Sequence, residues 1–492
     1  MQPLSRRNAL LMGGVGVAAT AVGAAGLAWT LTSQRAPVAG AALTHPAERS
    51  SAGGTLALEL EAAPATLELG GRQATALGYN GTSPGPTLRL RAGDLLRIRL
   101  LNRLAEPTNL HLHGLHVSPQ GNGDNVFVTV APGGSFDYEY RLPADHPAGV
   151  YWYHPHHHGM VAGQVFGGLF GAIIVEDNEP VPAAMDRVLV VSDTDLDAAG
   201  NVRRVPQAER MAGREGGLVL VNGQSNPLIS ALPGQRERWR LVNACVSRYL
   251  LLQLAGQDLQ LLGLDSGRFQ PPEPVTEVLL APGNRADLLV TAAAGGSVLR
   301  AAYYDRGSMP GMMGRGPAGR DTPDQSQGVA LATLQVAGEP AAAPAGLPPR
   351  PAAADLRELP VAAHRRFLLA AGMGAGSMGG GGSGMMAFTI NGREFDAART
   401  DTRVAAGSVE EWTVVNTSPM DHPFHLHVWP MQLISANGAA PAVPTWQDVV
   451  NVPANGQVTV RIAFKDFAGR SAYHCHILDH EDLGMMGVIE VR

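Results

Sequence analysis

Short runs of alternating apolar and polar residues recur along the whole chain, bounded by glycine, proline and asparagine. Examples lie at residues 87–102, 236–243 and 410–416. Residues two apart in a β-strand face the same side, so this alternation predicts strands with one buried face. Long amphipathic helical patterns are nearly absent. The pattern therefore predicts an all-β protein.

Three of these runs form an internal repeat. Their sequences are Ile-Arg-Leu-Leu-Asn ending at Asn102, Trp-Arg-Leu-Val-Asn ending at Asn243, and Trp-Thr-Val-Val-Asn ending at Asn416. Asparagine suits the turn that follows a strand. The repeat predicts three similar domains, and a segment rich in alanine and proline predicts a semi-rigid linker before the third. The expected limits are 53–180, 181–338 and 361–492 for the domains and 339–360 for the linker.

Length and composition agree with this organisation. The 492 residues suffice for three domains of roughly 150 residues each. The 60 glycines and 36 prolines suit a turn-rich β architecture. The net charge of −6 argues against nucleic acid as a partner. The two cysteines, Cys245 and Cys475, exclude a disulfide scaffold, and Cys245, in an apolar run, is expected to be a buried free thiol.

The N-terminus has the features of an export signal. Two arginines at 6 and 7 precede a weakly apolar stretch that reaches about residue 31, and this resembles a twin-arginine signal. The Ala-Gly-Ala at 39–41 would suit a signal peptidase. A transmembrane anchor is the alternative. We expect residues 1–42 to engage the twin-arginine export machinery, which predicts a periplasmic or cell-envelope location with no stable membrane span after cleavage.

Histidines follow the repeat at fixed distances. His-x-His pairs stand nine and eleven residues after Asn102 and Asn416, whereas leucines stand there after Asn243. A second pair follows a tyrosine in the first and third domains; His157 and His158 extend the first-domain pair, but the register favours the two histidines before them. The eight histidines are His111, His113, His154, His156, His425, His427, His474 and His476.

The pairing of these histidines indicates a metal centre. Each His-x-His points two imidazoles to one side of a strand, and the repeat makes the two sets related half-sites. Eight neutral imidazoles in one pocket would leave polar groups without partners, which is costly unless a metal binds them. Imidazole suits copper, zinc, iron or nickel, so the histidines alone leave the metal open.

Cys475 narrows the choice of metal. It lies between His474 and His476 and therefore faces the opposite way in an extended segment. There it can meet His422, His480 and Met485. Two histidines, one cysteine and a weak methionine form the ligand set of blue-copper electron-transfer sites. A structural zinc site is the alternative, but zinc gains nothing from a thioether.

Four segments together resemble the copper motifs of the multicopper oxidases, most closely the bacterial laccase-like and cuprous-oxidase members. They are His-Leu-His-Gly at 111–114, His-Pro-His at 154–156, His-Pro-Phe-His-Leu-His at 422–427, and His-Cys-His at 474–476 with its following histidine and methionine. The resemblance implies three tandem cupredoxin-like Greek-key β-sandwich domains, the middle one without ligands, and four copper ions. It implies type 1 copper at His422, Cys475, His480 and Met485, type 2 copper at His111 and His425, and a type 3 pair at His113, His154, His156, His427, His474 and His476.

The resemblance also implies a reaction. One-electron oxidation of phenolic or aromatic substrates, or of Cu(I), at the type 1 copper is coupled to four-electron reduction of O₂ to water at the trinuclear cluster. Water formation needs protons, and by resemblance Asp124 and Glu481 are the candidate donors; solvated turn carboxylates are the alternative. A copper-homeostasis cuprous oxidase with incidental phenol oxidation, a non-catalytic envelope scaffold and a copper store remain alternative functions.

Methionines bear on the identity of the reductant. They occur in glycine-rich surroundings at Met309, Met312 and Met313, and Met420 stands two residues before His422. Thioethers are soft ligands that select Cu(I). These four residues are therefore candidate substrate ligands. The alternative is that they belong to loops that pack at the rim of the type 1 site.

Overall fold

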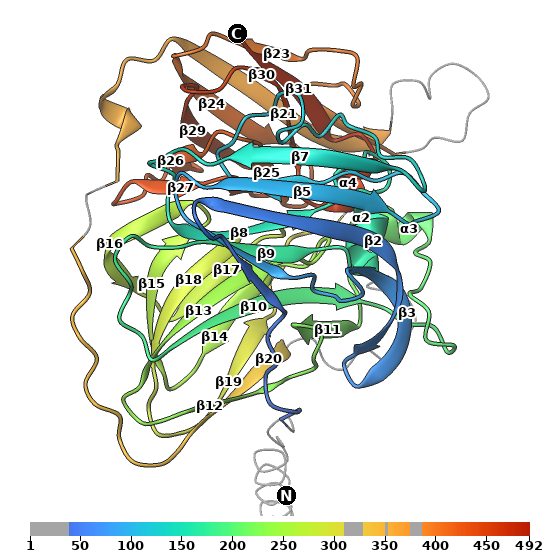
Figure 1. The fold of residues 1–492 in the computed structure, drawn as a ribbon. Coiled ribbons are helices and arrows are strands. Elements are labelled where there is room, and N and C mark those ends of the chain that lie inside the picture. Colours follow the sequence, from blue (N-terminus) through green and yellow to red (C-terminus); the bar gives the residue numbers. More distant parts are fainter. Residues whose placement is uncertain (1–38, 309–327, 350–352, 374–385) are drawn as a thin grey trace, which may run out of the picture. The chain divides into compact units, whose positions relative to one another are not determined.

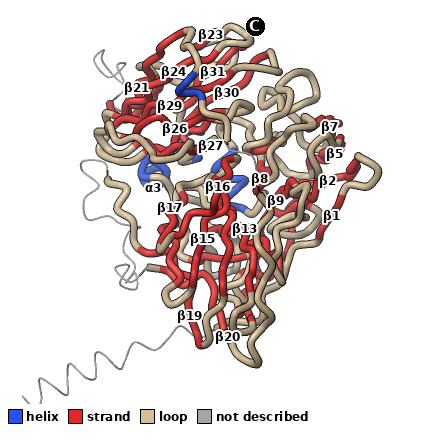
Figure 2. Tube along the Cα trace, turned by 90° about the vertical axis from the view of Figure 1, so that its left-hand side faces the viewer, coloured by secondary structure: helices blue, strands red, loops and turns tan. Residues whose placement is uncertain are grey.

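In a computed structural model of the chain, the structure describes residues 39–308, 328–349, 353–373 and 386–492 (Figure 1). Strands joined by turns and loops predominate there, and the few helices are short (Figure 2). The strands form sheets that each come from one stretch of the sequence. This arrangement confirms the all-β prediction.

The first domain contains the first half of the predicted metal centre. Its strands are β1 (Glu48–Ser50), β2 (Thr55–Leu69), β3 (Arg72–Tyr79), β4 (Thr87–Leu90), β5 (Leu95–Asn102), β6 (His111–His113), β7 (Ser135–Arg141), β8 (Gly149–His154) and β9 (Gly171–Val175), with helix α2 (Val161–Gly167) before β9. One sheet has the order β3-β2-β5-β7 and the other β1-β4-β9-β8-β6. Apolar side chains of both sheets, such as Leu60 and Ile173, meet in one core.

The middle domain repeats this plan. Its strands are β10 (Met185–Thr194), β11 (Leu218–Val221), β12 (Leu228–Ala231), β13 (Arg236–Asn243), β14 (Leu250–Leu254), β15 (Asp258–Leu264), β16 (Gly267–Pro274), β17 (Glu277–Leu280), β18 (Arg285–Thr291), β19 (Gly295–Ala302) and β20 (Val329–Val336), with helix α3 (Gln207–Ala212). The sheet orders are β11-β10-β13-β18-β15-β16 and β12-β20-β19-β14-β17.

The third domain contains the other half of the metal centre. Its strands are β21 (Ala363–Met373), β22 (Met386–Ile390), β23 (Thr402–Val404), β24 (Val409–Asn416), β25 (His422–Leu426), β26 (Met431–Ala436), β27 (Thr445–Gln447), β28 (Val449–Val452), β29 (Gln457–Ala463), β30 (Gly469–Cys475) and β31 (Met486–Val491), with the 3₁₀ turn η2 (Leu356–Glu358) and helix α4 (Leu478–Asp482). The sheet orders are β22-β21-β24-β29-β26-β27 and β23-β31-β30-β25-β28.

The three asparagines of the repeat have the same structural role. Asn102, Asn243 and Asn416 end β5, β13 and β24. Each side-chain oxygen accepts a hydrogen bond from the amide two residues ahead, and each side-chain nitrogen donates to a carbonyl on a neighbouring segment. This side-chain turn redirects the chain after the strand. The repeat seen in the sequence is therefore a repeat of structure.

The domains contact one another through extensive interfaces. Residues from 40 to 492 form one compact unit. An apolar cluster joins the first and middle domains through Trp152, Phe166 and Val242 among others. The strand β16 of the middle domain packs against β27 of the third (Figure 1). Asp482 of α4 accepts hydrogen bonds from the backbone amides of Gly159 and Ala162 at the start of α2. The first and third domains are thereby joined beside the second histidine motif.

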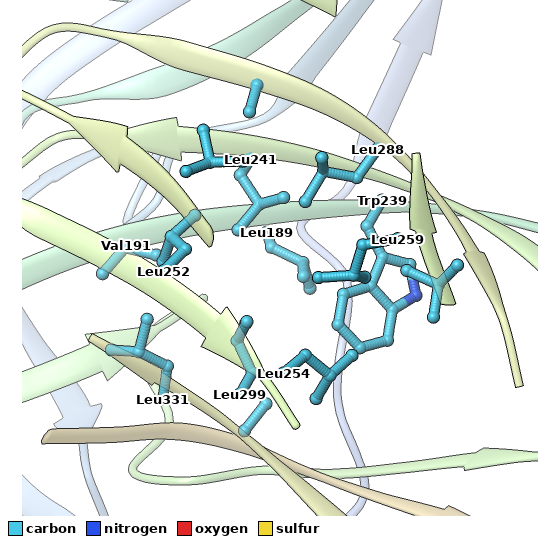
Figure 3. Packing of buried hydrophobic residues seen from close by; sticks show 14 of the residues in the cluster. Leu189, Val191, Trp239, Leu241, Leu252, Leu254, Leu259, Leu288, Leu299 and Leu331 are labelled. Atoms are coloured by element: carbon cyan, nitrogen blue, oxygen red, sulfur yellow. The ribbon is translucent and has the colours of Figure 1, made fainter. Parts of the chain in front are cut away.

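In the middle domain, leucines stand where the other domains have histidines. Leu252 and Leu254 of β14 are each 2% exposed and belong to the core of that domain. Figure 3 shows both leucines in the same apolar cluster as Trp239 and Leu241. In the middle domain these two positions therefore belong to the apolar core, whereas the equivalent positions of the outer domains are histidines.

Replacing Leu252 by alanine is expected to lower the free energy of unfolding by about 2–5 kcal/mol, because a cavity replaces a fully packed side chain. The metal content of the folded variant is expected to stay that of the wild type. Chemical unfolding and metal analysis measure the two quantities. A fall in metal content at unchanged stability would contradict the assignment of this residue to the core.

The predicted export signal, residues 1–42, lies almost entirely outside the described residues. In the described ranges we find no helix with the length and apolar character needed to cross a membrane. Residues 339–349, within the predicted linker, form neither helix nor strand. The exact domain and linker limits stay a prediction.

Candidate metal centre

The histidine pairs of the two outer domains lie on equivalent strands. β6 pairs with β8 so that His111 is opposite His154, and β25 pairs with β30 so that His425 is opposite His474. The alternation of a strand sends Leu112 into the first-domain core and the histidines on either side of it to the opposite face. The two half-sites are thus built by the same local structure.

All eight histidines meet between the first and third domains. Each is at most 1% exposed. His111 stacks on His427, and His113 stacks on His425, with ring centroids 3.9 Å apart in both pairs. Nε2 of His474 lies 3.1 Å from Nε2 of His156 and 3.0 Å from Nε2 of His427. The structure therefore brings the two predicted half-sites into one cluster, which we call the histidine cluster.

The ring nitrogens, joined in one case by a carboxylate oxygen of Asp448, fall into groups close enough to share a metal ion. In each group the ligand atoms lie within 4.8 Å of one another. Every one of these groups except His111–His113–His154 contains residues of the third domain, and the group His156–His427–His474 combines both outer domains. His157 and His158 are half-buried and belong to none of these groups. The groups are His111–His113–His154, His111–His425–His427, His156–His427–His474 and His113–His425–Asp448.

Hydrogen bonds at the outer edge of the cluster leave inner nitrogens free. Nδ1 of His111 faces Asp124 at 2.9 Å, Nδ1 of His154 faces the carbonyl of Pro155 at 2.7 Å, and Nδ1 of His425 faces the carbonyl of Asp448 at 2.7 Å. Their Nε2 atoms are buried and have no hydrogen-bond partner among the described residues. Buried polar atoms need partners, and bound metal ions would satisfy these nitrogens. The cluster fits metal binding.

Burial also keeps the imidazoles in the form that binds metal. Desolvation lowers the pKa of His154 to about 3 and of His474 to about 4, and it lowers the pKa of His111 and His427 well below the ordinary value. Metal ligation requires neutral imidazole. The cluster is therefore ready to bind a cation at neutral pH without first losing protons.

A second group of ligands surrounds Cys475 in the third domain. Its Sγ lies 3.4 Å from Nδ1 of His422 and 3.8 Å from Nδ1 of His480, and these two nitrogens are 3.3 Å apart. The Oγ of Ser418 lies 2.7 Å from Nε2 of His422. Phe388 stacks on His480 with ring centroids 4.2 Å apart. Both imidazoles are thus oriented with Nδ1 towards the sulfur.

Met485 lies in the segment that follows Cys475 and His480. Its amide donates to the carbonyl of His480, and its carbonyl accepts from the amide of Cys475. The side chain is fully buried in the third-domain core together with the thiol. Burial raises the pKa of that thiol, because a thiolate there would lack solvation. A bound cation would stabilise the thiolate, so this site also fits a metal ion.

The middle domain covers the loop of the cysteine site. The guanidinium of Arg214, just after α3, donates to both carboxylate oxygens of Asp479, at 2.6 Å from Nη2 to Oδ1 and 2.9 Å from Nε to Oδ2. Both side chains are buried. A Cβ on Gly213 would lie 2.9 Å from the side chain of Ile477. The segment that connects Cys475 to His480 is therefore held in place from the middle domain.

Both predicted acidic residues lie on the histidine cluster, away from solvent. Asp124 accepts from the amide of Leu112 besides facing His111, and burial raises its pKa to about 7. Glu481 is fully buried; its Oε2 lies 3.2 Å from Nδ1 of His474, and its Oε1 lies 3.5 Å from Nε2 of His156. Desolvation raises the pKa of Glu481 well above its ordinary value.

Sequence reasoning missed Asp448, which lies between β27 and β28. Its Oδ1 lies 3.0 Å from Nε2 of His113, and its backbone carbonyl faces His425. Arg285 of the middle domain pairs with its carboxylate. Neither residue belongs to a histidine motif or follows the repeat, so the sequence holds no signal for them.

The four candidate methionines and Cys245 do not belong to either group of proposed metal ligands. Met309, Met312 and Met313 lie outside the described residues. Met420 is 1% exposed, and its carbonyl accepts hydrogen bonds from Asn416 and Ser418. Cys245 is a buried free thiol, as predicted.

Comparisons with known proteins identify the family. Three sequence profiles described as Multicopper oxidase match residues 62–180, 185–322 and 373–492. The Multicopper oxidase mco of Staphylococcus haemolyticus is 28% identical over 84% of this chain and 83% of its own length. The cell division protein FtsP of Sodalis glossinidius is 30% identical over 99% of this chain and 98% of its own length.

A solved structure gives the same result. The multicopper oxidase from Campylobacter jejuni, described as a metallo-oxidase, superposes with a TM-score of 0.79 at 32% identity, covering 92% of this chain and 96% of that one. The expected cupredoxin-like fold is thereby confirmed. Because the three profiles together span all three domains, and the histidine cluster and cysteine site fit the metal that the family binds, this chain belongs to the multicopper oxidases.

Proposed function

We propose that this multicopper oxidase holds four copper ions in two sites. The observation that carries the proposal is the meeting of eight buried imidazoles from two domains directly beside a buried cysteine that is bonded to two of them. Three ions would lie in the histidine cluster and one at the cysteine site. The proposed ligands are His422, Cys475, His480 and Met485 for type 1 copper, His111 and His425 for type 2, and His113, His154, His156, His427, His474 and His476 for the type 3 pair.

Copper ions bound at these sites supply one-electron redox chemistry, which takes electrons from a reductant and reduces O₂ to two waters. The chain's own contribution is the connection between the sites. Cys475 is covalently joined to His474 and His476, so the thiol and the cluster are linked through a few bonds of backbone and side chain. The two sites are thereby held at a fixed separation.

Copper analysis and oxygen uptake test this proposal. Purified holoprotein is expected to contain four copper ions per chain, to be blue and to consume O₂ in the presence of a phenol or Cu(I). Removal of copper with a chelator is expected to abolish the colour and the oxygen uptake, and re-addition to restore both. A folded protein that binds copper but takes up no O₂ with either reductant would contradict the proposal.

Glu481 and Asp124 are proposed as the residues that hold protons near the cluster. Glu481 lies between His156 and His474, one histidine from each outer domain. Asp124 lies on the opposite histidine motif, against His111. Formation of water requires a proton for each electron, and buried carboxyls this close to the cluster imidazoles are suitable donors.

The Glu481→Gln variant is expected to keep its blue colour and copper content but to turn over about 100-fold more slowly, because a general acid typically contributes at least that factor. Glutamine preserves the shape of the side chain and cannot release a proton. Steady-state oxygen uptake across a pH series measures the effect. As a control, Glu237→Gln alters a buried carboxylate of β13 that pairs with Arg187 outside the cluster. Unchanged turnover of Glu481→Gln at every pH would remove Glu481 from the mechanism.

We propose that the reductant is a phenolic or aromatic compound or Cu(I). The relative from Campylobacter jejuni is described as a metallo-oxidase, which supports a metal ion as one reductant. Met420, two residues before His422, together with Met309, Met312 and Met313, supplies thioethers that would favour Cu(I).

Replacing Met309, Met312 and Met313 together by leucine separates the two classes of reductant. If these thioethers bind Cu(I), the variant is expected to lose cuprous oxidase activity while keeping phenol oxidation. Comparing kcat/KM for the two reductants measures the effect. Equal changes for both would favour a general role of the segment in access to the type 1 site.

A non-catalytic envelope role is the second candidate, and the similarity to the protein named FtsP favours it. A non-catalytic scaffold would not need complete copper motifs, whereas all four motifs are complete in this chain. Export through the twin-arginine route, proposed from residues 1–42, is compatible with both functions. Replacing Arg6 and Arg7 by lysine is expected to leave the protein in the cytoplasm, as fractionation would detect.

A further inference from the structure

The middle domain supplies no proposed copper ligand, but one of its turns reaches the histidine cluster. Gly283, in the turn before β18, lies against the ring of His476. A Cβ built there would be 2.8 Å from Cε1 of that ring, and the φ angle of +87° is one that L side chains rarely adopt. Only glycine lets the backbone approach a cluster histidine so closely.

Arg285, two residues further on, joins all three domains. It is fully buried, and its guanidinium donates two parallel hydrogen bonds to the carboxylate of Asp448 in the third domain, from Nη1 to Oδ1 at 2.5 Å and from Nη2 to Oδ2 at 2.6 Å. Its Nε donates to the carbonyl of Val150 in the first domain at 3.0 Å. A Cβ on Gly114, which directly follows the first histidine motif, would collide with Nη2. Parallel contacts of this kind fix geometry better than a single ion pair does.

Two further residues of the middle domain hold the backbone at Asp448 in place. The carboxylate of Asp265 accepts from the amides of Asp448 and Val449, both at 3.2 Å, and the side chain of Asn284 donates to the carbonyl of Val449 at 3.0 Å. Asp265 and Asn284 also belong to the middle domain. The position of Asp448 is therefore set by the domain that lacks ligands.

From that position Asp448 contacts two stacked histidines, one from each outer domain. Its Oδ1 faces Nε2 of His113 at 3.0 Å, and its backbone carbonyl faces Nδ1 of His425 at 2.7 Å. The two rings are nearly parallel, with an interplanar angle of 8°. Asp448 thus contacts a nitrogen of each of the two rings.

The contact determines which nitrogen of His113 can bind a metal. A carboxylate held by a guanidinium only accepts hydrogen bonds, so the hydrogen of the neutral ring is on Nε2 and the lone pair on Nδ1. Nδ1 of His113 lies 3.2 Å from Nε2 of His476, on the inner side of the cluster. His111, His154 and His425 have the opposite arrangement, with Nδ1 engaged and Nε2 free.

We propose that Arg285 and Asp448 are positioning residues of the copper cluster, which hold His113 in the Nε2–H form so that Nδ1 binds the metal. This inference rests on the proposed function, and it makes the middle domain a structural part of the cluster. In this proposal Asp448 acts on the ring of His113 and not as a metal ligand, because Arg285 donates to both of its oxygens and Oδ1 also faces that ring. Outer partners of ligating histidines commonly fix the tautomer and ring orientation in this way.

The test compares Arg285→Lys and Asp448→Asn with Arg238→Lys in the full-length holoprotein. Arg238 is a matched control: it is a buried arginine of the middle domain that also pairs with carboxylates, Asp177 and Asp287, and among the described residues it forms no ion pair with a histidine. In both arginine variants lysine keeps the positive charge but cannot form the two parallel hydrogen bonds of a guanidinium with a carboxylate. Chelator titration with copper analysis reports copper in the cluster, the blue absorbance reports the cysteine site in the same sample, and thermal melting reports folding.

Arg285→Lys and Asp448→Asn are expected to hold cluster copper about 10- to 100-fold more weakly, with blue absorbance per chain equal to that of the wild type. Arg238→Lys is expected to change neither quantity. If Asp448→Asn does not fold, Arg285→Lys decides the result. Cluster copper held as tightly as in the wild type, or cluster and blue copper lost to the same extent, would overturn the inference. A wild type without copper in the cluster would overturn the proposed function and this inference with it.

Discussion

The Cys475→Ser variant is expected to lose its blue colour and all oxygen uptake, with phenols and Cu(I) alike, while the histidine cluster still binds copper. The blue-copper ligand set depends on the thiolate, and a serine hydroxyl cannot replace it at neutral pH. The histidine cluster is formed by other residues, so its ring nitrogens remain in place. The loss is expected to be complete because, in the proposed reaction, every electron enters through this site.

Optical spectra, copper analysis and oxygen electrode measurements check this prediction. Cys245→Ser is the matched control, since Cys245 is the other buried free thiol of the chain and lies in the middle-domain core. It is expected to keep both colour and activity. Residual turnover of Cys475→Ser above the level of the copper-free protein would show that electrons reach the cluster by another route.

The His474→Ala variant is expected to lose O₂ reduction while keeping the blue site. Nε2 of His474 is within 3.1 Å of ring nitrogens of both His156 and His427, which come from different domains. Removing this imidazole leaves a gap at the centre of a three-histidine group and takes away the ring nitrogen that lies 3.2 Å from Oε2 of Glu481. The cysteine ligand itself is unchanged, so a reductant should bleach the blue colour.

Anaerobic reduction followed by admission of air measures this effect. Both proteins are expected to lose their colour at the same rate when the reductant is added. After air is admitted, the wild type is expected to regain its colour rapidly and His474→Ala to stay bleached. His364→Ala is the control, because that side chain is 71% exposed and pairs only with Glu411 among the described contacts. Rapid recovery of colour in His474→Ala would exclude an essential role of this imidazole in the cluster.

Much of the site could be predicted because the information is local and repeated. A strand sends alternate residues to opposite faces, so each His-x-His had to present two imidazoles together, and Cys475 had to face away from its neighbours. The repeat around Asn102 and Asn416 then related the two halves. The same counting placed Leu252 in the middle-domain core.

The contacts of Asp448 could not be predicted in this way. It lies 335 positions from His113 in the sequence and 163 positions from Arg285. Neither residue repeats between domains, and each looks like an ordinary charged residue near a strand end. Only the docking of three folded domains brings them together, because each domain fixes its own strands without reference to the others.

The sequence by itself determined the strands, the threefold repeat and the histidine and cysteine motifs that we propose bind metal, since these follow from short-range alternation and residue chemistry. The tertiary structure decided which ring nitrogen of each histidine is free and which carboxylates the cluster contacts. It also decided that the middle domain, which supplies no proposed copper ligand, reaches the cluster: Gly283 lies against His476, and Arg285 pairs with Asp448. These features depend on distances between segments far apart in the chain, and no local pattern encodes them.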